Sequence, residues 1–315
     1  MSRLAAFIPA VKTLDESISR AKAAERLGYE SIWLSQLPDA RDAALVVAAY
    51  AQATERIKFG MGVLPIYTRH PTAMAQTAAT LDEMTKGRFI LGLGVSHKVT
   101  VESMWGLHLD HPVEAMREYL TIVQTSLAEG SCSFDGTYFS AHWSYSAPRP
   151  PKLPVVIAGL SSRMLDLAGE LTDGVVLWMC APNYIREHVV PIVKAAREKV
   201  GKSLDGFEIV AHVPVCLTSD RAAALDAFRP TVQRYSNLPY YRKVLDAAGY
   251  KEQLEAGNIS DGMLDDFAGI GDELQVRAAI QRYRDAGLTL PAAGPFSGHK
   301  GAAGFEATLE AAAGT

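Results

Sequence analysis

The sequence has few of the features that would place it in a specialised class of protein. It contains only three cysteines in 315 residues. Cys132, Cys180 and Cys216 are far apart, so they match no metal-binding or redox spacing, and buried free thiols are expected. This pattern excludes a disulfide framework and indicates a reducing compartment.

A surplus of positive charge and long apolar runs are also missing. The chain has 31 Lys and Arg against 35 Asp and Glu, a formal net charge of −4, and the cations are scattered. No uninterrupted apolar stretch reaches the roughly 20 residues that a membrane span requires, and no charged-then-apolar leader opens the chain. We therefore expect a cytoplasmic protein with a small-molecule substrate and with no nucleic-acid or membrane partner.

The chain does contain a regular alternation of short apolar runs and helical patterns. Strands are expected at residues 4–8, 31–35, 57–63, 88–93, 154–158, 174–179, 208–217 and 288–293. Helices are expected at residues 14–27, 39–54, 71–86, 112–128, 161–171, 182–200 and 272–286. Eight strands separated by helices favour an α/β fold of the (β/α)8 TIM-barrel type, formed as one domain by residues 1–315.

Two segments are additional to a minimal barrel. Residues 130–151, after the fourth strand, contain Asp135-Gly136 between two short runs, which is typical of a hairpin. Residues 218–270, after the seventh strand, carry helical patterns and four tyrosines. A segment of this length suits either a lid over the C-terminal face of the barrel or a dimer contact. An alanine-rich stretch, residues 302–313, predicts a final helix.

The strand-helix-strand unit at residues 57–97 carries strong local signals. Gly60 and Gly62 lie inside a run of strand length, which suggests a bulge or the close approach of a flat group. Gly94 and Ser96 end the second strand of the unit, at the edge where barrel enzymes hold their substrates. We therefore expect part of the functional site at the two strand ends of this unit.

A second junction takes a buried strand directly into a helix at Ala158-Gly159-Leu160-Ser161, with Arg163 in the first turn. Free backbone N–H groups at a helix start suit an anionic phosphate. The hydroxyl of Ser161 can donate to the phosphate, and Arg163 can pair with its charge. A tight turn in which Ser161 caps the helix explains the same residues equally well. The glycine fingerprint GxGxxG is absent, which disfavours a dinucleotide-binding Rossmann fold.

Taken together, the order and spacing of five segments resemble the bacterial luciferase-like oxidoreductases, and among them the branch that uses the deazaflavin coenzyme F420. The segments are residues 27–33 (LGYESIW), 62–71 (GVLPIYTRHP), 87–94 (GRFILGLG), 116–120 (MREYL) and 164–174 (MLDLAGELTDG). The resemblance implies a (β/α)8 barrel with insertions after strands 4 and 7, a cofactor at its C-terminal face and a homodimer.

The resemblance also implies which residues bind the coenzyme. The backbone from Ala158 to Ser161 would meet its phosphate, and a cis peptide at Gly62-Val63 would support its ring. Trp178 and Tyr67 both lie near strand ends. Each is either a side chain that lines this site or an aromatic residue of the core. The cofactor-binding residues expected in this way are Gln36, Gly62, Val63, Gly94, Val95, Ser96, Ala158, Gly159, Leu160, Ser161, Arg163 and Trp178.

His97 is the candidate catalytic residue, because it follows the fourth strand and an imidazole titrates near neutrality. An ordinary loop histidine is the alternative. Many members of the family have an Asp-His pair where this chain reads Ser35-Gln36, and some have a glutamate where Val95 or Ser96 stands. These departures disfavour oxidation of an alcohol. No metal is expected, since His108 and His111 lack further ligands at a suitable spacing.

The resemblance therefore predicts an enzyme that transfers a hydride between reduced coenzyme F420 and a small organic substrate. Reduction of a C=C or C=N bond is favoured, with His97 or water completing the protonation. A deazaflavin carries two electrons as hydride and does not readily activate oxygen. The alternatives are an FMN-dependent luciferase-like monooxygenase and a non-catalytic protein that binds flavin or deazaflavin.

Overall fold

The computed structural model describes residues 3–10, 12–299 and 301–314, and its centre is a closed parallel barrel. In spatial order the barrel strands are β1 (Ala5–Phe7), β2 (Ser31–Leu34), β3 (Lys58–Met61), β5 (Phe89–Gly94), β8 (Val155–Ala158), β9 (Gly174–Leu177), β10 (Glu208–Leu217) and β12 (Leu290–Pro295). β12 pairs with β1 and so closes the ring. The expected (β/α)8 fold is confirmed, and each expected strand overlaps one of these eight.

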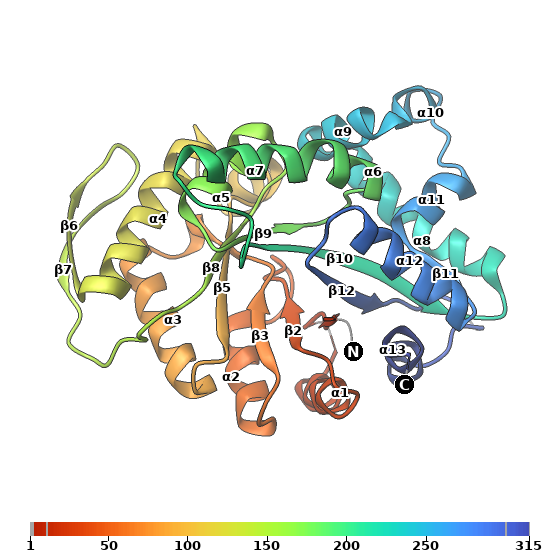
Figure 1. Ribbon diagram of the computed structural model, residues 1–315, viewed down its shortest axis with the longest axis horizontal. Coiled ribbons are helices and arrows are strands. Elements are labelled where there is room, and N and C mark those ends of the chain that lie inside the picture. Colours follow the sequence, from red (N-terminus) through yellow and green to blue (C-terminus); the bar gives the residue numbers. More distant parts are fainter. Residues whose placement is uncertain (1–2, 11, 300, 315) are drawn as a thin grey trace.

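Helices surround the barrel (Figure 1). They are α1 (Leu14–Arg26), α2 (Ala43–Ala53), α3 (Pro71–Thr85), α4 (Pro112–Glu129), α5 (Ser162–Leu171), α6 (Pro182–Tyr184), α7 (Val190–Lys199), α12 (Glu273–Asp285) and α13 (Phe305–Ala313). The π-helical turn η3 (Ile185–Val189) joins α6 to α7, so the helix expected at residues 182–200 consists of three pieces. A further π-helical turn, η2 (Val99–Met104), follows β5.

Four helices begin later than expected, and at Ser161 and Asp272 the residue expected to begin the helix is its N-cap. The helix expected from residue 39 begins at Ala43, since the Asp42 side chain accepts the N–H groups of Ala44 and Leu45 and is therefore the N-cap. The final helix likewise begins at Phe305, after the expected residue 302.

The two insertions lie at opposite ends of the long axis (Figure 1). The first contains the antiparallel hairpin β6 (Ser131–Asp135) and β7 (Ser140–Ser144), as Asp135-Gly136 predicts. The second contains α8 (Arg221–Ser236), α9 (Pro239–Leu245), η4 (Asp246–Tyr250), α10 (Lys251–Glu255), α11 (Asp261–Phe267) and β11 (Gly269–Gly271). β11 pairs with the end of β10 and joins this insertion to the sheet.

Gly60 and Gly62 each mark a special feature of the backbone after residue 57. A Cβ atom on Gly60 would lie 2.4 Å from the indole of Trp33, so the flat group expected there is a side chain of the barrel itself. The Gly62-Val63 peptide is cis, as predicted. It leads into the short strand β4 (Leu64–Pro65), which pairs with β5, and the 3-10 turn η1 (Ile66–Thr68).

The interior of the barrel is filled by side chains. A buried cluster occupies its middle, formed by Ala5, Trp33, Val156, Val210, Leu290 and Ala292. At the N-terminal end, Arg3 donates to Glu30 at 2.7 Å and to Glu208 at 2.8 Å. The search for a ligand site therefore turns to the C-terminal end, where barrels of this kind hold their substrates.

The three cysteines are free and buried, as expected. Among the helices of the described ranges, none combines the length and the apolar character needed to cross a membrane.

Candidate active site at the C-terminal end of the barrel

Three flat side chains stack at the ends of β1 and β9 and the middle of β10. The ring of His212, on β10, lies 3.9 Å from that of Phe7 with 11° between the planes. On its other side, Trp178 stacks at 4.4 Å and 18°. A Cβ atom on Gly294 would lie 1.9 Å from His212 Nε2, so this glycine leaves the room that the imidazole occupies.

His212 was missed from the sequence, where the only signal was a lone polar residue in a buried strand. Burial lowers its pKa to about 3, against a smaller opposing effect of the Gly294 backbone. The imidazole is therefore neutral at pH 7 and serves as a flat packing surface. Above it, Trp178 Nε1 is buried and has no hydrogen-bond partner within the described residues.

The end of β5 places the candidate catalytic residue. Ser96 has a φ of 58°, a left-handed conformation that is uncommon for a residue other than glycine and often found at functional sites. The next residue, His97, is partly buried, and its ring lies 5.6 Å from that of Tyr241. Burial lowers the pKa of His97 below its ordinary value of about 6.5, so its neutral form predominates at pH 7.

The start of α5 confirms the capping role of Ser161 and leaves the neighbouring amides free. Its hydroxyl accepts the N–H of Met164 at 3.3 Å and caps the helix. Within the described chain, no hydrogen bond uses the N–H groups of Gly159, Leu160 and Ser161. These amides therefore stay available to an anion. Arg163, in the first turn, is exposed and pairs with Glu114.

The residues that replace the family's Asp-His pair hold the neighbouring strand end. The hydroxyl of Ser35 donates to the carbonyl of Gly62, and the backbone N–H of Gln36 donates to the carbonyl of Val63 at 3.2 Å. The carboxamide oxygen of Gln36 accepts the N–H of Ala43 at 2.8 Å. In this structure the Gln36 side chain is thus engaged within its own loop.

The structure brings several expected cofactor residues together. A Cβ atom on Gly94 would lie 2.3 Å from Val63 and 3.6 Å from Ala158, so these three residues meet across β5. Val95 and Ser96 follow directly on the same strand end. Gly159 turns the chain close to α5, since a Cβ atom there would lie 3.0 Å from Leu165.

Tyr67, on η1, has a buried hydroxyl without a hydrogen-bond partner among the described residues. Burial is the main cause that raises its pKa to about 12, with Asp110 and Tyr240 contributing. His108 and His111 are exposed. In the described ranges, no group of three His, Cys, Asp or Glu side chains is arranged for a metal ion.

Directly after its strands, this end of the barrel carries aromatic side chains and no carboxylate, and charged groups such as the Arg69–Asp42 pair lie farther along the loops. In the two positions after each of the eight barrel strands there is no Asp or Glu. On the side of α5 lie the free amides of residues 159–161 and the side chain of Arg163. The unpartnered indole N–H of Trp178 lies nearer the centre. The residues present therefore fit a flat ring that carries hydrogen-bond acceptors and a phosphate-bearing chain.

The fold and this site define the class: a (β/α)8 barrel protein with a binding site for a flat, phosphate-bearing molecule at the C-terminal face. The chain belongs to the luciferase-like monooxygenase family, whose model matches residues 2–290. The family expected from the sequence is confirmed.

Relatives in sequence and in structure include F420-dependent enzymes. The chain is 30% identical over 292 residues to the 5,10-methylenetetrahydromethanopterin reductase of Archaeoglobus fulgidus, covering 87% of each chain. It is 27% identical over 303 residues to a putative coenzyme F420-dependent oxidoreductase of Mycobacterium tuberculosis, covering 85% of this chain and 87% of that one. The resemblance to this branch is confirmed.

Among solved structures, the coenzyme F420-dependent tetrahydromethanopterin reductase of Methanopyrus kandleri has the same fold. The TM-score is 0.84 at 24% identity, over 99% of this chain and 97% of that one. An F420-dependent secondary alcohol dehydrogenase in complex with an F420-acetone adduct gives a TM-score of 0.79 at 19% identity, over 93% of each chain.

Proposed function

We propose that the protein is a coenzyme F420-dependent oxidoreductase that transfers a hydride from the reduced coenzyme to a C=C or C=N bond of a small organic molecule. The observation that carries this proposal is an aromatic barrel end with no carboxylate directly after its strands, beside the free amides of α5. Hydride transfer to such bonds requires orientation and exclusion of water more than a charged group. The F420-dependent relatives support the same coenzyme.

The residues expected to hold the coenzyme lie in two groups. Around α5, the amides of Gly159, Leu160 and Ser161, next to Ala158, would bind the phosphate, with Arg163 as the cation. Around the end of β5, the residues near the ring would be Gln36, Gly62, Val63, Gly94, Val95, Ser96 and Trp178. When bound, the deazaflavin supplies the hydride, and the protein orients it.

The second task of the protein is to move a proton. His97 lies beside the site, and its lowered pKa makes it a weak base for an alcohol. The protonated fraction of His97 rises as the pH falls, and that form is an effective acid. The direction rests on the missing Asp-His pair and glutamate: their absence supports reduction over alcohol oxidation, with His97 or water protonating the product.

Two alternatives remain for the same site. An FMN-dependent monooxygenase is favoured by the description of the family, and the free amides of α5 would hold the FMN phosphate equally well. A non-catalytic protein that binds flavin or deazaflavin would need the same residues without His97.

A binding and turnover experiment separates the three. We expect fluorescence titration of the apoprotein to give tighter binding of coenzyme F420 than of FMN, and the reduced coenzyme to be oxidised anaerobically by a panel of unsaturated substrates. Tighter FMN binding together with oxygen consumption would identify the monooxygenase. Tight coenzyme binding without turnover across the panel would favour the carrier.

The proposal extends to the assembly and the cellular setting. On the family resemblance, we propose a single-domain protomer with insertions at about residues 130–151 and 218–270 that forms a homodimer. On composition, we propose a cytoplasmic enzyme with a small-molecule substrate.

A further inference from the structure

The second insertion reaches the candidate site through aromatic contacts. Tyr235, at the end of α8, meets Trp178 edge to face, with ring centres 5.5 Å apart and 78° between the planes. Tyr241, on α9, meets Tyr235 at 4.8 Å and 73°. Tyr241 also contacts His97 at 5.6 Å. These four rings, here called the aromatic wall, run from the end of β9 to the end of β5.

The wall is fixed to the barrel at further points. Phe228, on α8, stacks with Phe296, directly after β12, at 5.2 Å and 29°. The side chain of Asn183, on α6, donates to the carbonyl of Ala248 at 2.8 Å. Contacts at the ends of β5, β9 and β12 hold α8 and α9 in one position. The insertion is therefore part of the shape of the site.

The aromatic wall is partly exposed, and a hydrogen-bond donor in it has no partner among the described residues. Trp178, Tyr235 and His97 are all partly exposed, whereas Tyr241 is buried behind them. Trp178 Nε1, which can only donate, and the Tyr67 hydroxyl are buried without partners in the part of the chain that the structure describes. Leaving a buried donor unpaired is costly, so a bound molecule with acceptor atoms would remove that cost.

Resting on the proposed function, we propose that the aromatic wall is the substrate-binding surface and that it selects a flat unsaturated heterocycle with ring-nitrogen or carbonyl acceptors. Aromatic rings pack well against flat rings, in stacked or edge-to-face geometry, and less well against puckered aliphatic ones. The surface is built by the insertion, so it belongs to this chain and not to the barrel as such.

Matched probe molecules test the selection. For a C=N bond the pair is dihydroisoquinoline and pyrroline, and for a C=C bond it is coumarin and dihydropyranone. With oxidised coenzyme bound, we expect calorimetry to show that the aromatic member of each pair binds about tenfold more tightly. Equal affinity within both pairs, or no measurable binding of either aromatic probe, overturns the proposal.

Variants locate the selection on the wall. Tyr235→Leu should reduce the preference for the aromatic probe of each pair about fivefold. Its dissociation constant for the coenzyme should stay within about twofold of that of the unmodified protein. Tyr250→Leu is the matched control, since Tyr250 lies on the same insertion but packs on Phe267 at 5.7 Å. This control should keep the full preference.

The variants also distinguish failure of this inference from failure of the proposed function. If Tyr235→Leu weakens coenzyme binding and leaves the preference unchanged, the wall serves the coenzyme and the inference is wrong. If the unmodified protein does not bind coenzyme F420 at all, the proposed function fails first.

Discussion

At the scale of single residues, His97 and His212 both lie toward the C-terminal end of the barrel, but their neighbours give them different tasks. His212 is partly exposed, but both faces of its ring are stacked, one on Phe7 and the other on Trp178, so the ring is held in the packing. His97 contacts one ring, that of Tyr241, and stays partly exposed. Environment, and not residue type, makes His97 the candidate for proton transfer.

Replacing His97 should separate hydride transfer from protonation. We expect His97→Ala to slow protonation of the product about 100-fold, the lower range for a general acid, and to leave the hydride step nearly unchanged. Because the pKa of His97 is lowered, the protonation rate of the unmodified enzyme should rise as the pH falls below about 6.5, and the variant should lose this rise. Single-turnover kinetics across pH measure both steps.

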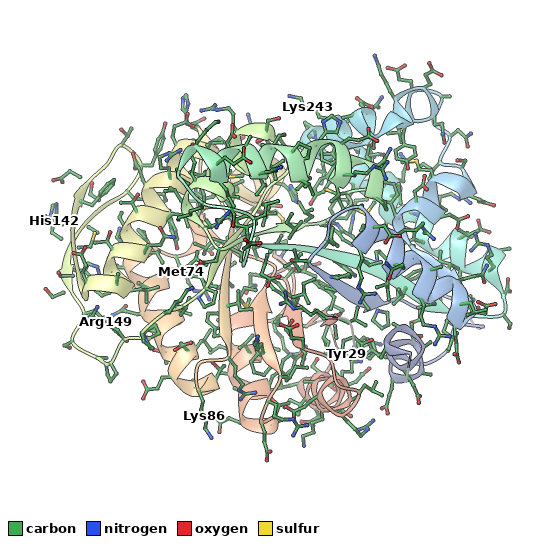
Figure 2. The ribbon with its side chains drawn as sticks, viewed as in Figure 1. Tyr29, Met74, Lys86, His142, Arg149 and Lys243 are labelled. Carbon is green, nitrogen blue, oxygen red and sulfur yellow. The ribbon has the colours of Figure 1, made fainter. Side chains whose placement is uncertain are left out.

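The control is His142→Ala, since His142 lies on the hairpin at the far end of the molecule (Figure 2). His142→Ala should behave as the unmodified enzyme. Unchanged hydride transfer and protonation in His97→Ala would show that His97 is an ordinary loop residue.

At the scale of elements, α5 illustrates how one helix end carries two functions. The Ser161 hydroxyl satisfies the N–H of Met164, so the cap is formed without using the preceding amides. The helix dipole adds positive potential at the same end. Arg163 adds a formal charge, although Glu114 already pairs with it. Most of the anion affinity should therefore come from the backbone, with a smaller part from Arg163.

Removing Arg163 should test this division. We expect Arg163→Ala to weaken binding of coenzyme F420 about fivefold, equivalent to about 1 kcal/mol, because the arginine is exposed and shared with Glu114. A deazaflavin without the phosphate chain should bind both proteins equally. Fluorescence titration at low and high salt measures this, and the salt dependence should fall in the variant.

Arg117→Ala is a suitable control for the charge change. Arg117 pairs with Glu170 between the same two helices, α4 and α5, away from the helix start. An equal loss of affinity in both arginine variants would mean that only net charge matters and that Arg163 has no specific part in the site.

At the scale of the whole molecule, the barrel is a filled cylinder whose strands are connected through its interior. Arg3 joins the N-terminal ends by binding Glu30 and Glu208, and Trp33 lies against Gly60 in the middle. Near the C-terminal end, the stack of Phe7, His212 and Trp178 connects β1, β10 and β9. The stability of the whole fold therefore depends on a neutral imidazole at this position.

The acid stability of the protein should report that dependence. The pKa of His212 is lowered to about 3 in the folded protein, whereas in the unfolded chain it is about 6.5. Protons therefore bind more readily to the unfolded state, and stability is lost as the pH falls from about 6.5 toward 3. Each pH unit in this window costs up to about 1.4 kcal/mol, and the loss between pH 7 and pH 5 is about 2 kcal/mol.

His212→Phe keeps a flat ring in the stack and removes the titrating group. Urea unfolding of both proteins at pH 7 and pH 5 gives the stability that each one loses on acidification. The contributions of carboxylates and other histidines are the same in both proteins and cancel when the two losses are subtracted. We expect the variant to lose about 2 kcal/mol less than the unmodified protein on acidification. Parallel losses in the two proteins would show that His212 is protonated as easily in the folded state as in the unfolded one.

The sequence alone determined those features that depend on neighbours along the chain. The period of apolar residues predicted eight strands, Asp135-Gly136 predicted the hairpin, and Gly60 predicted a close approach by a flat group. These signals are local, so they survive without knowledge of the fold. Where a local signal had two meanings, as for Ser161, the structure confirms the helix cap, and phosphate binding by the free amides stays a prediction.

Only the tertiary structure decided which distant residues meet. His212 contacts Phe7 and Trp178 because closure of the barrel turns three strand ends toward one axis, and no spacing in the sequence encodes that distance. Tyr235 and Tyr241 reach Trp178 and His97 only because α8 and α9 fold back over the end of the barrel. Ring contacts across tens to hundreds of residues depend on the direction in which each strand points a side chain, and packing fixes that direction.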